Sequence, residues 1–226
     1  MKLRIMTANL WNGAADPASL AELLEALRPD VLAVQELSHE QAEAIATVLP
    51  HGVLEPREDH HGMGIALARA ARIRRIGLPG RAARAARLCP KDWSGLLAPL
   101  EVMNVHIWAP HIAPFWRTWS HRRGQLRGLL RYLAEEPRSN RLVCGDFNAT
   151  PSWPLYRRVA VPLDDLALRH ARRIGEQPRR TWGPWAGSPR LLRIDHAFAR
   201  GLEPLDVRVV PVPGSDHSAL VIDLEA

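Results

Sequence analysis

The chain has 226 residues, of which 46% are hydrophobic and 24% charged. This composition is typical of a folded globular protein and excludes a disordered chain, and the length favours one domain. Two cysteines, Cys89 and Cys144, exclude a disulfide framework and cannot form a structural zinc site unaided. No stretch approaches the roughly 20 apolar residues of a membrane helix, and residues 1–10 lack the apolar run of a signal peptide. We therefore expect a single domain over residues 1–226, cytoplasmic, monomeric and without stable membrane insertion.

The chain carries 30 Lys and Arg against 24 Asp and Glu, a formal net charge of +6. Lysine occurs only at Lys2 and Lys91, so nearly all of the cations are arginine. A GC-rich genome explains such a bias, and arginine also suits bidentate phosphate contacts. Either way, a basic surface predicts attraction to polyanions.

The first half of the chain alternates predicted strands and helices. Polar and apolar residues alternate over 2–10, which predicts a strand, and Asp16-Pro17 opens a helix of regularly spaced leucines. An apolar strand over Val31–Gln35 and a second helix follow. We expect these helices to bury Leu20, Leu23, Leu24 and Leu27 in the first case, and Ala42, Ile45, Ala46 and Leu49 in the second.

Beyond residue 60 the pattern predicts several strands that are joined without helices. Residues 63–69 and 72–78 suggest a hairpin, 79–95 a loop, and 96–107 a long strand. An aromatic loop with Trp116 and Trp119 precedes a strong helix. Further elements are a strand over 141–145, a short helix near 152–159, and strands near 192–199, 205–211 and 218–224. Strands joined without helices favour a mixed sheet or two sheets with helices outside.

Polar side chains lie in or next to six of these strands, mostly near a strand end, where packing alone does not require them. They are Asn9, Glu36, Asn104 with His106, Asp146 with Asn148, Asp195 with His196, and Asp216 with His217. Each one alone has an ordinary structural explanation, such as a turn cap, a carboxylate at a helix start or a hydrogen-bonded core histidine. Six occurrences at strand ends instead suggest one convergent site.

The chemistry of this set is specific. Asn, Asp and Glu offer hard oxygen ligands, which suit Mg²⁺ or Mn²⁺ rather than structural zinc or copper. Histidines with aspartate partners supply proton transfer or stabilise charge in the transition state. The residues together predict metal-assisted hydrolysis of a phosphate ester.

The ordered motifs resemble those of the endonuclease/exonuclease/phosphatase superfamily, the DNase-I-like fold. The motifs are Thr7-Ala8-Asn9-Leu10-Trp11, Gln35-Glu36, Asn104-Val105-His106, Gly145-Asp146-Phe147-Asn148, Arg193-Ile194-Asp195-His196 and Ser215-Asp216-His217. The resemblance spans Asn9 to His217. It implies an α/β fold, a four-layer αββα sandwich of two mixed β-sheets flanked by helices, and divalent-metal hydrolysis of phosphoric esters.

The resemblance also implies roles for individual residues. Metal binding falls to Glu36, with Asn9 beside it, and to Asp216. Asp146 positions or deprotonates the attacking water, and Asn148 is its polar companion. Asp195 orients His217, which contacts the scissile phosphate, and His106 is a second histidine that stabilises the phosphate or protonates the leaving oxygen. Which group is the general acid stays open.

Arginines interleaved with aromatics favour a nuclease that hydrolyses DNA, or RNA, through a metal-activated water. The cofactor is then Mg²⁺ or Mn²⁺. We predict substrate contacts from the residues Asn104, Trp116, Arg122 and Trp182. The loop tryptophans also allow a phosphatase or phosphodiesterase that acts on a phospholipid or small phosphate ester. A non-catalytic nucleic-acid-binding module is a third alternative, which the intact polar series disfavours.

Overall fold

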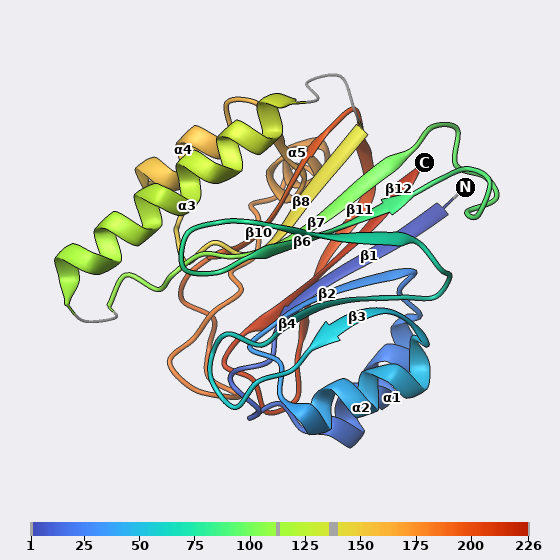
Figure 1. Ribbon diagram of the computed structural model, residues 1–226, viewed down its shortest axis with the longest axis horizontal. Coiled ribbons are helices and arrows are strands. Elements are labelled where there is room, and N and C mark those ends of the chain that lie inside the picture. The colour runs from blue at the N-terminus through green and yellow to red at the C-terminus, as the bar shows by residue number, and fades with distance from the viewer. Residues whose placement is uncertain (1, 112–113, 136–139, 226) are drawn as a thin grey trace.

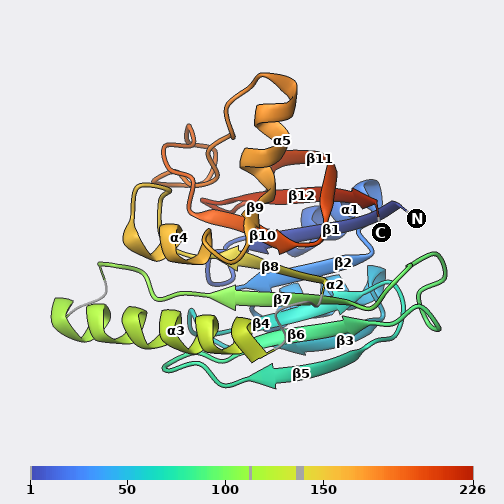
Figure 2. The same ribbon diagram turned by 90° about the horizontal axis from the view of Figure 1, so that it is seen from above.

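The computed structural model describes residues 2–111, 114–135 and 140–225. Within these ranges, twelve strands form two six-stranded sheets. The two sheets pack against each other, with helices on the outside (Figures 1 and 2). The first sheet has the order β11-β12-β1-β2-β4-β3. Its strands are β1 (Lys2–Asn9), β2 (Val31–Gln35), β3 (His51–Glu55), β4 (Met63–Leu67), β11 (Glu203–Pro211) and β12 (Ser218–Glu225).

The second sheet has the order β5-β6-β7-β8-β10-β9. Its strands are β5 (Arg72–Ile76), β6 (Ala83–Leu88), β7 (Leu100–His106), β8 (Asn140–Asp146), β9 (Asp164–Asp165) and β10 (Asp195–Arg200). Both sheets are mixed: β1 and β2 are parallel, as are β7 and β8, and the other pairs are antiparallel. The four-layer αββα sandwich expected from the sequence is confirmed.

Helices cover the outer faces of the two sheets. On the first sheet lie α1 (Pro17–Leu27) and α2 (His39–Val48), and on the second lie α3 (Phe115–Glu135) and α4 (Pro154–Val159). A fifth helix, α5 (Leu166–Ile174), packs along β10 and β11 (Figure 2). None of the helices in the described ranges combines the length and apolar character needed to cross a bilayer.

Local signals set the first two helices. The Asp16 side chain accepts from the backbone N–H of Ser19, Pro17 occupies the first turn, and Arg28 ends α1 in a left-handed conformation. The helix α2 begins with a capping box between Ser38 and Gln41. One expectation for its inner face is wrong, because Ala46 is exposed.

Three apolar clusters hold the layers together. The central one lies between the two sheets and includes Ile5, Ala33, Val102 and Leu142. The other two lie between each sheet and its covering helices. Because β2 and β4 are buried on both faces, their sequences are almost continuously apolar or small rather than alternating. The strand β7 is equally buried but includes the polar residues Glu101, Asn104 and His106.

Several predicted elements need correction. Residues 63–69 and 72–78 do not pair as a hairpin: β4 pairs with β2 and β3, whereas β5 pairs with β6 in the other sheet. The strand β6 lies inside the predicted loop 79–95, and its Ala- and Arg-rich sequence has weak strand propensity. Trp116 and Trp119 lie within α3 rather than in a loop, and the strand β3 and the helix α5 were not predicted.

Candidate active site

The strand ends meet at one edge of the sandwich. Within the first sheet Asn9 stands in register with Gln35, and within the second Asp146 stands in register with both His106 and Asp195. His217 precedes β12, whose N-terminal end lies beside the C-terminal end of β1. The polar side chains therefore converge at this edge, around a pocket of about 330 Å³.

Two local features position the Asp146 carboxylate at the end of β8: the glycine before it and the turn after it. Gly145 has φ +137°, and a Cβ there would collide with the carbonyl oxygen of Val105, so only glycine permits this close approach of β7 and β8. Immediately after it, Asp146 Oδ1 accepts from the backbone N–H of Asn148 at 2.7 Å. The Asn148 side chain donates to Asp146 Oδ2 at 2.9 Å and to Ile107 O at 3.0 Å, which fixes the carboxylate.

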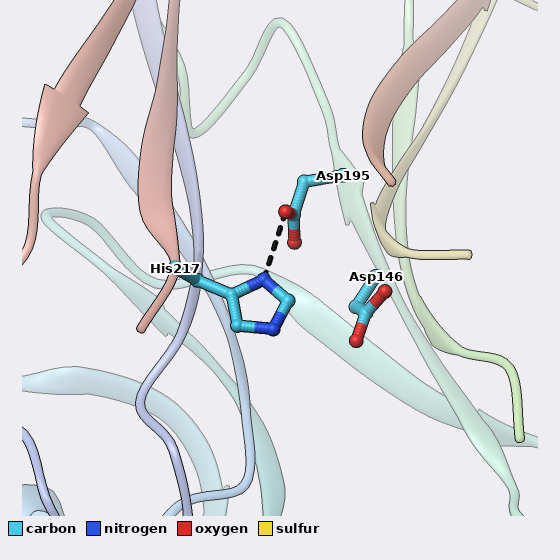
Figure 3. Close-up of side chains that lie close together, drawn as sticks. All are labelled: Asp146, Asp195 and His217. Carbon is cyan, nitrogen blue, oxygen red and sulfur yellow. Dashed lines mark hydrogen bonds and ion pairs between the residues drawn. The ribbon is translucent and has the colours of Figure 1, made fainter. Parts of the chain in front are cut away.

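Asp195 and His217 form a buried pair across the two sheets. Asp195 Oδ2 accepts from His217 Nδ1 at 2.9 Å, and Figure 3 shows both residues with Asp146. Burial works against the charged imidazole, but the charge and hydrogen bond of Asp195, together with the charges of Asp146 and Asp216, outweigh it and raise the pKa of His217 to about 9. Burial, followed by the charge of Asp195, raises the pKa of Asp146 to about 7. This places an imidazolium between two carboxyl groups.

His106 has a different environment. Its Nδ1 contacts the guanidinium of Arg81, and its Nε2 lies 3.6 Å from Glu36 Oε1 and 3.5 Å from Asp146 Oδ2. Because a guanidinium only donates, Nδ1 accepts and the proton of the neutral ring sits on Nε2, toward the carboxylates. Burial and the Arg81 charge hold the pKa of His106 well below its ordinary value. His106 is thus arranged as a neutral hydrogen-bond donor.

Glu36 lies at the pocket with a left-handed backbone conformation, φ 55°. For a residue other than glycine this conformation is costly, and such strain is typical of functional positions. Its carboxylate contacts His60 Nδ1 at 2.6 Å and Asn9 Nδ2 at 3.3 Å. Asn9 Nδ2 also donates to Asp146 Oδ2 at 3.1 Å, and Asn9 Oδ1 accepts from the backbone N–H of Trp11. In this arrangement Asn9 holds the two carboxylates together and does not present an oxygen.

The oxygen ligands at the pocket fit a divalent cation. Glu36, Asp146 and Asp216 all line it, and their carboxylates are the hard ligands that Mg²⁺ and Mn²⁺ prefer. Asp216 Oδ1 is buried without a hydrogen-bond partner in the described part of the chain, while its Oδ2 accepts from Trp182 Nε1 at 2.9 Å. Ligand atoms of Asp146, Asp195 and His217 also lie within 4.8 Å of one another, but the last two are already joined to each other.

Of the four predicted substrate contacts, only Trp182 lines the pocket. Asn104 is 0% exposed and its Nδ2 donates to Val34 O and Gly64 O, so we reassign it to bridging the two sheets. Arg122 is buried, and its guanidinium is bonded to the carbonyls of Trp108 and Asn148. Trp116 is 71% exposed on α3 and does not line the pocket.

Other assignments also change in the folded chain. His196 is buried, bonds Ala149 O through Nε2 at 2.8 Å and belongs to the core. Arg81, His60 and Trp153 line the pocket although the sequence did not single them out for it. Arg81 lies in an arginine-rich stretch of the sequence. Only the pairing of β6 with β7 shows that Arg81, rather than a neighbouring arginine, reaches the pocket.

Comparison with known proteins identifies the class. Residues 6–217 match the model of the Endonuclease/Exonuclease/phosphatase family, and the chain belongs to this family. Members of this superfamily are generally phosphoric ester hydrolases such as nucleases and phosphatases. A comparison with curated protein sequences found no match.

Solved structures share the fold at low sequence identity. An endonuclease/exonuclease/phosphatase from Bacteroides vulgatus superposes with a TM-score of 0.76 at 18% identity, covering 100% of this chain and 99% of the other. D. rerio TDP2 complexed with a single-strand DNA product gives 0.73 at 18% identity, over 100% and 99%. The human Nocturnin catalytic domain with bound sulfate gives 0.68 at 23% identity, over 99% and 94%.

Proposed function

We propose that the chain is a divalent-metal-dependent phosphodiesterase that hydrolyses nucleic acid, with DNA as the first substrate to test. The observation that carries this proposal is the buried Asp195–His217 pair, which lies beside Asp146 in a pocket that Glu36 and Asp216 also line. The net charge of +6 favours a polyanionic substrate. Two structures with the same fold contain a single-strand DNA product and a sulfate.

We assign the roles from the contacts within the pocket. Glu36 and Asp216 hold the cation, which when bound offsets charge on the phosphate and lowers the pKa of water. Asp146, fixed by Asn148, accepts a proton from the attacking water. The His217 imidazolium, held by Asp195, donates to a phosphate oxygen, and the Nε2–H of His106 donates to a second one. Trp182 holds Asp216 and forms part of the pocket wall.

A single panel of substrates tests the proposal. Supercoiled plasmid, single-stranded DNA, RNA and bis(p-nitrophenyl) phosphate are each incubated with Mg²⁺, Mn²⁺ or a chelator. We expect cleavage of a nucleic acid with metal and none with chelator, and loss of cleavage in His217→Ala with the fold retained by circular dichroism. Turnover of the small ester without cleavage of any nucleic acid points instead to a phosphatase or small-ester phosphodiesterase. Binding to DNA without turnover of any substrate contradicts the enzyme assignment.

A further inference from the structure

A second concave surface lies beside the candidate active site. It is a groove of about 520 Å³ between α3 and α4, which lie next to each other on the same sheet in Figure 1. Its volume falls within the range of small-ligand pockets, about 300–1,000 Å³. The residues that matter for its chemistry are Trp119, Trp153, Arg123, Arg158, Leu126 and Leu155. We name this surface the α3–α4 groove.

The α3–α4 groove adjoins the catalytic pocket. Trp153 lines both of them. Arg122, which also lines the groove, donates to the carbonyl of Asn148 and lies over the ring of Trp153, with 5.4 Å from its Cζ to the ring centroid. The loop that carries Asp146 and Asn148 therefore forms the boundary between the two. Trp153 is thus the point at which the two surfaces meet.

The side chains of the groove combine flat aromatic faces with positive charge. Trp119 is 43% exposed, and the guanidinium of Arg123 lies 5.3 Å from its ring centroid. Arg158 is exposed, and none of the described residues that line the groove is acidic. Leu126 and Leu155 are buried and form its apolar part. Helix packing accounts for the leucines, but it does not require a half-exposed tryptophan flanked by two exposed arginines.

This combination matches one type of ligand. A nucleobase stacks on aromatic rings and on guanidinium planes, and its phosphates pair with arginine. A base inside a duplex is stacked on both faces and cannot enter such a groove. An unpaired base can, provided that its strand continues from the neighbouring pocket.

We propose that the α3–α4 groove binds an unpaired base of a single-stranded nucleic acid whose scissile phosphate lies in the catalytic pocket. The base stacks against Trp119, and Arg123 and Arg158 contact the flanking phosphates. This assignment rests on the proposed function and adds to it a preference for single-stranded substrate.

The test compares Trp119→Ala and Arg123→Ala with the wild type and with Arg131→Ala. Arg131 is an exposed arginine two turns further along α3, outside the groove, so its replacement removes the same charge. The substrates are a single-stranded DNA of about 12 nucleotides, the blunt duplex of the same sequence and bis(p-nitrophenyl) phosphate. We expect Trp119→Ala to raise KM for the single strand about 10-fold, with kcat, the duplex and the small ester unchanged. Arg131→Ala should leave all three unchanged.

The same variants separate failure of the groove assignment from failure of the proposed function. If the wild type cleaves no nucleic acid, the proposed function has failed, and binding of the labelled single strand, measured by fluorescence anisotropy, then tests the groove alone. A Trp119→Ala variant with wild-type KM and wild-type binding overturns the groove assignment. A rise in KM for the duplex equal to that for the single strand also overturns it. Binding to vesicles of anionic phospholipid is measured alongside, and a Trp119→Ala variant that loses vesicle binding while its binding to the oligonucleotide is unchanged overturns it as well.

Discussion

Asp195 and His217 come from different sheets and are joined by a hydrogen bond of 2.9 Å between Oδ2 and Nδ1. Asp195 begins β10 in the second sheet, and His217 directly precedes β12 in the first. His217 is also tied to β1, since its backbone N–H donates to Ser215 Oγ, which in turn donates to Asn9 O. The pair therefore forms only when the two sheets pack in their native arrangement, so the candidate active site depends on the packing of the core.

Replacing Asp195 by asparagine keeps the shape of the side chain and removes its charge. The raised pKa of His217, about 9, depends on that charge against the opposing effect of burial, so the variant loses the imidazolium at neutral pH. We expect kcat on the cleaved nucleic acid to fall by about 10²- to 10⁴-fold with little change in KM. Steady-state kinetics at pH 7 measure this, and a kcat within a few-fold of wild type contradicts the role of the pair.

Removal of the Glu36 carboxylate tests the metal assignment. Glu36→Ala should weaken Mg²⁺ binding by at least about 10-fold in isothermal titration calorimetry, because the cation loses a hard anionic ligand. Glu43→Ala, an exposed carboxylate on α2, is the matched control and should bind Mg²⁺ as the wild type does. Unaltered Mg²⁺ affinity in Glu36→Ala would exclude this residue as a ligand.

Arg81 is expected to act through His106. Its guanidinium contacts His106 Nδ1 and donates to His61 Nδ1 at 3.0 Å, so it holds the His106 ring with Nε2 toward the pocket. Arg81→Ala should lower kcat by about 10- to 100-fold, since a misplaced donor loses its alignment with the phosphate. His61→Ala, on the far side of the guanidinium, should have a smaller effect. Similar kcat values for Arg81→Ala and the wild type would show that His106 keeps its orientation unaided.

Asn104 should contribute to stability rather than to substrate binding. It is fully buried, its Nδ2 donates to Val34 O and Gly64 O, and its Oδ1 accepts from Gln35 Nε2 at 2.7 Å. Asn104→Leu leaves these groups unpaired in the core, which should lower the free energy of unfolding by about 2–4 kcal/mol. Urea denaturation measures the loss. An increase in KM at unchanged stability would instead return Asn104 to the substrate site.

A buried ion pair between Glu101 and Arg141 should make the stability of the protein sensitive to acid. Burial opposes ionisation of Glu101, but hydrogen bonds from Tyr132 and Arg74 and the charge of Arg141 lower its pKa. Arg141 Nε lies 2.6 Å from Glu101 Oε1 and is itself buried. Glu101→Gln leaves Arg141 buried without a counter-charge, and should cost about 3–5 kcal/mol of unfolding free energy at pH 7.

The sign of the pH dependence follows from the lowered pKa of Glu101. Its contribution is fully present above the unfolded value, about 4.3, and is lost as the pH falls through the lower folded value. The difference in stability between the wild type and Glu101→Gln should therefore shrink below about pH 4. Urea denaturation across pH 3–7 checks this, and a difference independent of pH contradicts the assignment.

Local sequence signals predicted the regular elements near the N-terminus well. Asp16, Pro17 and Ser38 mark helix starts through contacts within one turn, and Val31–Gln35 is an apolar run bounded by polar residues. The wrong predictions concern strands whose pairing partners are not their neighbours in the sequence or could not be predicted from it. The strand β6 is held by β7, and β5 leaves the sheet of β4 entirely, although the short connection between them suggests a hairpin.

The motif residues were predicted because their spacing reflects strand ends. The side chains of His106, Asp146, His217, Glu36 and Asp216 line one pocket, and Asp195 lies close to two of them, Asp146 and His217. Asn104 was misassigned because alternation along β7 places it on the same face as His106 without saying which of them reaches the edge. Arg122 and Trp116 do not line the pocket. They lie on a helix whose rotation about its axis depends on the apolar contacts beneath it, which the sequence alone does not give.

The sequence by itself determined the mixed α/β character and the set of polar residues at the strand ends, because these depend on periodicity and caps. The resemblance carried by the ordered motifs added the family and its four-layer fold. Only the tertiary structure decided which side chains face the pocket and what state they hold. Arg81 and His106, 25 residues apart, meet through the pairing of β6 and β7, and Asp195 and His217 meet across the two sheets. Burial and charge then separate the two histidines into a neutral donor and an imidazolium, and neither property can be read from a residue in isolation.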